Sequence, residues 1–152
     1  MPYTIQFECS TGRCITLLVM VGLTDETKAT LAKYRMEKAY TALTEGKLLF
    51  ENEFYSGAVS KLYYACYYAA SALLIKSGFA SKTHAGVKGL LGEHFVKTGK
   101  LTKDEGRYFS TLFEKRHAND YEDFIETNKE EAEVFVRQAE IFVNSAEKIV
   151  KG

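Results

Sequence analysis

The side chains best suited to chemistry lie close together in the last third of the chain. Six consecutive positions hold four of them: Arg116, His117, Asp120 and Tyr121. An arginine guanidinium is always charged and presents a planar fork of donors that fits phosphate oxygens, and a histidine titrates near neutral pH. A guanidinium with a general base is the minimal set for cleaving RNA by attack of its 2′-hydroxyl group.

A second interpretation of the same residues needs no ligand. Arg116 and Asp120 are four positions apart, which is the spacing at which opposite charges pair on a helix surface. Tyr121 would then pack below the ion pair. The residues by themselves leave both interpretations open.

Metal coordination and cysteine chemistry are poorly supported. His84 and His94 are ten positions apart, do not share a helix face, and have no HExxH or ExxH pattern beside them. Cys9, Cys14 and Cys66 form no CxxC pair, so we expect neither a zinc site nor a disulfide framework. Cys66 lies within an apolar stretch and is predicted to be a core residue. We therefore expect no metal and no cofactor.

A run of glycines at 86, 89 and 92 resembles a phosphate-binding loop only superficially. No strand precedes these glycines, and their three-residue spacing aligns them on one face of a helix. We expect them to permit close packing between helices.

The stretch that should position the chemical residues is 54–77, FYSGAVSKLYYACYYAASALLIKS. It is apolar in almost every direction of a helical projection, which predicts the central helix of a bundle. Lys61 and several hydroxyl groups make it too polar to span a membrane. Some of its four clustered tyrosines must face away from the core, where they could line a cleft or a dimer contact: Tyr63, Tyr64, Tyr67 and Tyr68.

Capping patterns predict the flanking helices. Thr24 should begin the first helix, and Gly78 should follow the end of the second in a left-handed conformation. Ser81 should begin a shorter third helix that closes at Gly99. Two capping boxes should open the fourth and fifth helices, Thr102 with Glu105 and Thr127 with Glu130. The sequence therefore predicts an all-α fold, an up-and-down antiparallel four-helix bundle with an additional short helix.

Composition limits the possible functions. The chain has 152 residues, enough for one domain with a proper core. Its 20 basic residues balance its 20 acidic residues, so a general basic field for nucleic acid is absent, although a local patch is compatible with this balance. The cysteine usage fits a reducing compartment, and we expect a cytoplasmic protein.

The first residues differ from the rest. We expect residues 1–22 to be an N-terminal extension of unknown role and residues 23–152 to form the helical bundle. The apolar run 15–21 is too short to span a bilayer and lacks a signal-peptide cleavage site, so no membrane association is expected. Met20 is an alternative first residue for the helical domain.

Three stretches together resemble the HEPN superfamily, the nucleotide-binding domains of higher eukaryotes and prokaryotes. They are the segments FYSGAVSKLYYACYYAASALLIKSGF, KTHAGVKGLLGEHFVKTGKL and RHANDY. The likeness covers roughly residues 25–150 and is to the small stand-alone bacterial and archaeal branch. It implies a helical bundle, commonly dimeric, with a polar cleft where the fourth helices of two subunits meet.

The resemblance also implies a range of activities. Many members are metal-independent ribonucleases, often toxins, and others are encoded beside a minimal nucleotidyltransferase as a toxin–antitoxin pair. The ribonuclease signature is an arginine, a polar neighbour, and a histidine after four to six intervening positions. Arg116 and His117 match its beginning, but positions 121–123 hold tyrosine, glutamate and aspartate. The usual general base is therefore missing, and only His117 could replace it.

These observations lead to three hypotheses. The first is a dimeric HEPN-type bundle that binds a nucleotide or an RNA phosphate in a cleft and works with a nucleotidyltransferase-type antitoxin. Its ligand-binding residues would be Arg116, Asp120, Tyr121, Tyr64, Tyr67, Tyr68, Lys82 and His84. The second is a metal-independent ribonuclease with a degenerate motif, in which Arg116 and His117 are catalytic. The third is a non-catalytic interaction module.

Overall fold

The computed structural model describes residues 23–121 and 126–152, and the side chains of residues 119–121 lie outside the described part. The expected extension at 1–22 also falls outside it. All regular structure in the described residues is helical, which confirms the all-α prediction. The elements are α1 (Asp25–Glu51), α2 (Tyr55–Lys76), α3 (His84–Leu91) with a π-helical turn η1 (Gly92–Val96), α4 (Lys103–Tyr121) and α5 (Lys129–Lys151).

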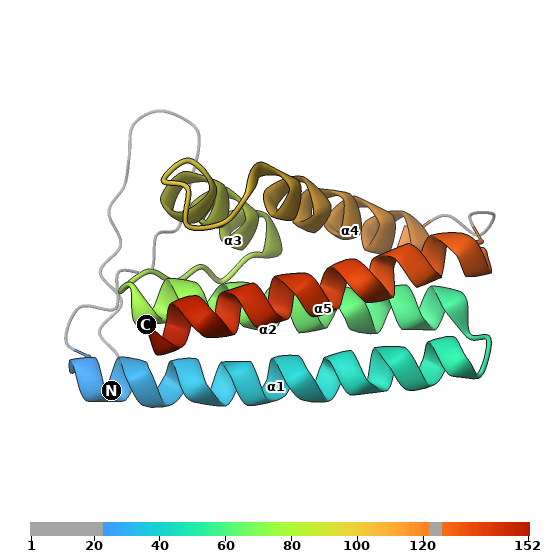
Figure 1. Cartoon of the computed structure of the whole chain (residues 1–152). Helices are drawn as coiled ribbons and strands as arrows, with labels where there is room; N and C mark the ends of the chain where they lie inside the picture. The colour runs from blue at the N-terminus through green and yellow to red at the C-terminus, as the bar shows by residue number, and fades with distance from the viewer. Residues whose placement is uncertain (1–22, 122–125) are drawn as a thin grey trace.

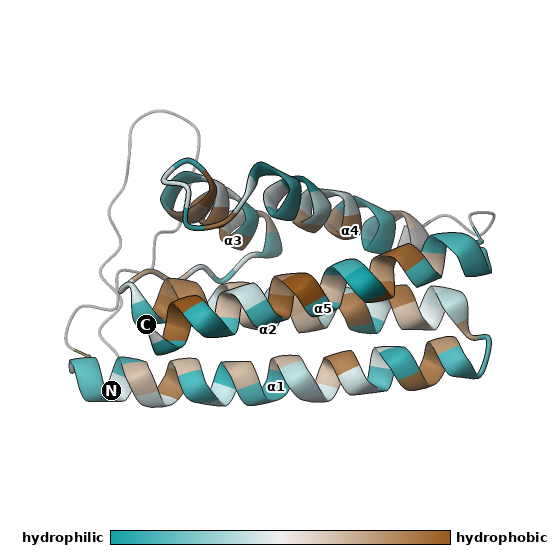
Figure 2. Cartoon of the chain, in the orientation of Figure 1, coloured by the Kyte–Doolittle hydropathy of each residue, from teal (hydrophilic) through white to brown (hydrophobic). Residues whose placement is uncertain are grey.

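The helices pack in two groups around α2 (Figure 1). The long helices α1, α2 and α5 lie side by side, with α1 antiparallel to both α2 and α5, and α3 and α4 cover one edge of this group. Helix α2 contacts each of the other four α-helices, so the prediction of a central helix is confirmed. Its alanines allow this close approach, because Ala58, Ala65 and Ala69 are completely buried and add little bulk between backbones. Figure 2, coloured by residue hydropathy, shows hydrophobic residues in the last turns of α2 and alternating hydrophobic and hydrophilic residues along α5.

Several predicted helix ends are confirmed. The Thr24 hydroxyl accepts a hydrogen bond from the Thr27 amide at 3.1 Å, which caps α1. The Glu105 carboxylate accepts from the Thr102 amide at 2.8 Å, and the Thr102 hydroxyl accepts from the Glu105 amide at 3.1 Å, which completes the capping box of α4. Gly78 after α2 has a φ of 83°, a left-handed conformation that favours glycine.

Two predicted caps are wrong. Thr83, not Ser81, caps α3 by accepting from the Gly86 amide at 3.0 Å, while Ser81 supports the preceding turn by accepting from the Thr83 amide. Asn128, not Thr127, caps α5 by accepting from the Glu131 amide at 2.8 Å. In both places neighbouring polar residues offered competing caps, and the rotation that buries the apolar face of the helix selected one of them.

The glycine prediction for the third helix is also wrong. A Cβ atom added at position 86 would meet the capping side chains of α3 itself, and one added at 89 or 92 would meet no atom within 4 Å. The close approach between helices occurs instead at Gly46 in α1, where an added Cβ would lie 2.9 Å from Leu62 Cδ2 of α2. No helix in the described part is long and apolar enough to cross a membrane.

Candidate functional site: an arginine on a tyrosine surface

Arg116 lies near the end of α4 and connects that helix to α2. One guanidinium nitrogen, Nη2, donates a hydrogen bond to the Tyr64 hydroxyl at 2.9 Å. The guanidinium carbon lies 5.2 Å from the ring centroid of Tyr64 and 5.6 Å from that of Tyr63, within the range of cation–π attraction. Phe109, Leu112 and Arg116 recur at helical spacing on α4, so the residues that anchor α4 in the core also direct this arginine toward α2.

Tyr63 and His84 form the base of the cluster. The Tyr63 side chain is completely buried, and its hydroxyl oxygen lies 2.6 Å from Nδ1 of His84, the first residue of α3. The imidazole stacks on Tyr67, with ring centroids 4.4 Å apart and planes inclined by 14°. This pair therefore fixes the beginning of α3 against the middle of α2.

The protonation of this pair follows from its surroundings. Burial raises the pKa of Tyr63, so the phenol keeps its proton and donates it to Nδ1. The pKa of His84 is lowered from its usual 6.5, mainly by burial and to a smaller extent by the positive charge of Arg116. We therefore assign His84 as a neutral imidazole with its proton on Nε2, where it is a hydrogen-bond donor.

The remaining tyrosines form a half-buried surface on α2. Tyr64, Tyr67 and Tyr68 are spaced at three- and four-residue intervals and share one side of the helix, whereas Tyr63 points into the core. The ring of Tyr68 lies 6.3 Å from that of Tyr64 and faces two cations of α1, Arg35 at 5.7 Å and Lys38 at 5.5 Å. Sequence reasoning missed both cations, because nothing in the local pattern links them to a tyrosine of another helix.

The other predicted site residues stand apart from this cluster or outside the described part. His117 is exposed and follows Arg116 directly, so it leaves the helix about 100° away from it. Its ring lies 6.2 Å from that of Phe113 on the same helix. Lys82 is exposed in the segment before α3. The side chains of Asp120 and Tyr121 lie outside the described part, and so does the predicted Arg116–Asp120 ion pair.

Metal and cysteine chemistry have no counterpart in the described residues. No three histidine, cysteine, aspartate or glutamate side chains in the described part are grouped so that they could hold a metal ion. Cys66 is fully buried, and burial raises the pKa of its thiol. A thiol in this environment is a core residue and a poor nucleophile.

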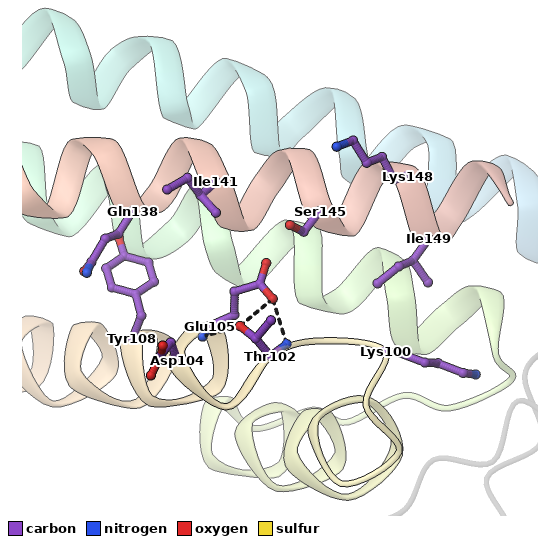
Figure 3. Close-up of a pocket in the computed structure, with 10 residues that line it drawn as sticks. All are labelled: Lys100, Thr102, Asp104, Glu105, Tyr108, Gln138, Ile141, Ser145, Lys148 and Ile149. Atoms are coloured by element: carbon purple, nitrogen blue, oxygen red, sulfur yellow. Dashed lines mark hydrogen bonds between the residues drawn. The ribbon is translucent and has the colours of Figure 1, made fainter.

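A groove lies at the other end of α4, between that helix and α5 (Figure 3). It has a volume of about 570 Å³, and its lining includes Tyr108, Ile141 and Ile149. The dashed lines in Figure 3 show the carboxylate of Glu105 bonded to Thr102 in the capping box. Because Glu105 and Thr102 already hydrogen-bond each other at the beginning of α4, we take the cluster around Arg116 as the stronger candidate for a functional site.

Fold and site together define a class of protein, an all-helical bundle in which the last turns of one helix present an arginine to tyrosines of the central helix. Residues 32–149 match the family model described as the HEPN domain. The chain belongs to the HEPN family, as the resemblance in the sequence indicated.

The relatives support the same assignment. A "UPF0332 protein" of Thermotoga maritima is 36% identical over 124 residues, covering 82% of this chain and 94% of that protein. Two proteins of Methanocaldococcus jannaschii are also similar. "Putative toxin MJ0142" is 35% identical, covering 68% of this chain and 70% of that protein. "Putative toxin MJ0605" is 37% identical, covering 66% and 80% respectively.

Proposed function

We propose that the cluster around Arg116 binds the phosphate of a nucleotide or of RNA. The observation that carries this proposal is the guanidinium of Arg116, held by Tyr64 and placed against two aromatic rings at the surface of α2. A guanidinium oriented in this way is preorganised for phosphate oxygens, and it loses little rotamer freedom on binding.

The neighbouring groups suit the remaining parts of a nucleotide. Tyr67 already stacks on His84, so the half-buried rings of Tyr64 and Tyr68 form the surface on which a base would stack, an interaction worth about 1–3 kcal/mol per base. The Nε2 proton of His84 offers a neutral donor beside the guanidinium. The ligand would therefore be recognised by the Arg116 charge, the His84 donor and the tyrosine rings. None of these groups selects one base over another.

We further propose that the chain acts as a homodimer and pairs with a nucleotidyltransferase-type antitoxin. Support comes from the HEPN family membership and from the two relatives whose names contain the word toxin. Size-exclusion chromatography with light scattering tests the dimer, and a monomer at micromolar concentration contradicts it. The antitoxin proposal predicts a nucleotidyltransferase gene beside the gene for this chain, and its product should co-purify with the chain.

Binding is tested by titrating the protein with AMP and with a labelled single-stranded RNA. We expect Arg116→Gln to weaken both by about 10- to 100-fold, since a hydrogen bond to a charged group contributes about 1.5–3 kcal/mol. Arg107→Gln is the matched control, because Arg107 lies on the same helix and pairs at the surface with Asp104. Equal affinities for the Arg116 and Arg107 variants contradict the proposed site.

The same samples decide the alternative of a metal-independent ribonuclease, which the toxin names of the relatives favour. In that case RNA should be cleaved in the presence of EDTA, and both Arg116→Gln and His117→Gln should abolish cleavage. Intact RNA with the wild-type protein removes this alternative. If the wild-type protein neither binds these ligands nor cleaves RNA, the non-catalytic interaction module is the hypothesis that remains.

A further inference from the structure

The cations of α1 that face Tyr68 form a second charged position on the tyrosine surface. Arg35 and Lys38 are one helical turn apart and half-buried, so both extend from the same side of α1. The Nζ atom of Lys38 also lies 5.3 Å from the ring centroid of Tyr34, which is 51% exposed. Two cations and two aromatic rings therefore meet at this edge of α2.

Neither cation is neutralised by a carboxylate within the part of the chain that the structure describes. Several other basic residues of the long helices do pair with carboxylates: Lys28 with Asp25, Lys47 with Glu140, and Lys61 with Glu45. Arg35 and Lys38 instead contact aromatic rings. In a chain without net charge, this arrangement leaves a local excess of positive charge beside rings that are open to solvent.

This charged position is continuous with Arg116. The ring of Tyr68 neighbours that of Tyr64, whose hydroxyl accepts the hydrogen bond from Arg116. Across α2 the order is therefore a cation from α4, two tyrosine rings, and two cations from α1. Proteins that bind single strands combine cations for the phosphates with aromatic rings on which the bases stack.

Resting on the proposed phosphate site at Arg116, we propose that Arg35 and Lys38 form a second phosphate subsite, with Tyr68 as a stacking ring between the two. The ligand class is then single-stranded RNA longer than one nucleotide. A mononucleotide has phosphate at one end only and would occupy the Arg116 subsite alone. A strand whose phosphates repeat along its backbone would occupy both subsites.

The test compares two ligands and two pairs of substitutions. The ligands are AMP and a fluorescein-labelled single-stranded RNA of ten nucleotides, each measured over a series of salt concentrations. The test variant is Arg35→Gln with Lys38→Gln, which removes both charges and retains much of each aliphatic stem. The control variant is Arg137→Gln with Lys129→Gln, which removes the same charges from exposed positions on α5.

The test variant should bind the RNA roughly tenfold more weakly and leave AMP affinity unchanged. Its slope of log affinity against log salt should fall by about 1.4, since each phosphate contact to a single strand contributes about 0.7. The control variant should change neither ligand. The charge-preserving exchange Arg35→Lys with Lys38→Arg should retain RNA affinity. If thermal unfolding shows that the double glutamine variant does not fold, Lys38→Gln replaces it, with half the change in slope.

Other outcomes separate failure of this inference from failure of the proposed function. If Arg116→Gln weakens both ligands while the Arg35 and Lys38 substitutions change neither, the second subsite is wrong and the Arg116 site stands. The second subsite is also wrong if the α1 substitutions weaken AMP and RNA equally. If the wild-type protein binds neither ligand, both proposals fall.

Discussion

The partly buried hydrogen bond between Tyr63 and His84 supplies the most quantitative prediction about the site. Substituting Tyr63→Phe removes one oxygen atom and keeps the ring, so the ring contacts with Phe109 and Phe113, at 6.1 Å and 6.0 Å between centroids, are retained. What is lost is the 2.6 Å hydrogen bond to Nδ1 of His84. The substitution therefore isolates the interaction that joins α2 to the beginning of α3.

The magnitude follows from the environment of each partner. A net hydrogen bond contributes about 1 kcal/mol, and a buried partner left without one costs about 1–3 kcal/mol. His84 is only half-buried, so water can satisfy part of its lost bond. We therefore expect Tyr63→Phe to lower the free energy of unfolding by about 1–2 kcal/mol. For a chain of this length the melting temperature should fall by roughly 2–8 °C.

The assay is urea unfolding followed by circular dichroism at pH 7.5, combined in a double-mutant cycle with His84→Phe. The single and double variants should show a coupling of about 1 kcal/mol, since either single change already removes the bond. Tyr34→Phe is the matched control, because this tyrosine is exposed to solvent at the surface of α1, and it should cost less than about 0.5 kcal/mol. An additive cycle, or a Tyr63→Phe variant as stable as the control, would refute the reasoning.

Three further predictions concern the rest of the fold. The pKa of His84 lies below 6.5 in the folded state, so as the pH falls the imidazole is protonated in the unfolded state before it is protonated in the folded state. The free energy of unfolding should therefore fall as the pH drops below 6.5. His84→Gln should remove that part of the pH dependence in unfolding measured from pH 5 to 8, and an unchanged profile would assign it to other groups. Gly46→Ala should lower the free energy of unfolding by about 1–3 kcal/mol, because the added Cβ would overlap the Leu62 side chain. An unchanged free energy in urea unfolding would show that the leucine can move aside. Asn128→Ala should lower the free energy of unfolding by about 1 kcal/mol, because it removes the side chain that caps α5. Thr127→Ala should lack this cost, because Thr127 is not at the cap position. If Thr127→Ala proves the more costly of the two, Thr127 is the cap.

Local patterns predicted the helices well and their ends unevenly. The Thr102–Glu105 box and the left-handed Gly78 depend on residues close in sequence, so their geometry was determined before any tertiary contact. At Ser81 and Thr127 a second polar residue lay within two positions of the predicted cap. Packing of the helix against the core then selected Thr83 and Asn128, a choice that no local pattern contains.

The candidate site divides in the same way. Arg116 could be singled out because arginine, histidine, aspartate and tyrosine fall within six residues, and α2 could be identified as central because it is apolar on most sides. The sequence by itself therefore determined the fold class, the central helix and the arginine, since all of these depend on the composition and periodicity of short segments.

Only the tertiary structure decided how these parts meet. It buried Tyr63 and left Tyr64, Tyr67 and Tyr68 at the surface of α2, and it paired Tyr63 with His84, 21 positions later. It also brought Arg35 of α1 to Tyr68 of α2. The physical reason is that the rotation of each helix about its axis is set by simultaneous packing against several neighbours, so contacts between distant residues are properties of the assembled bundle.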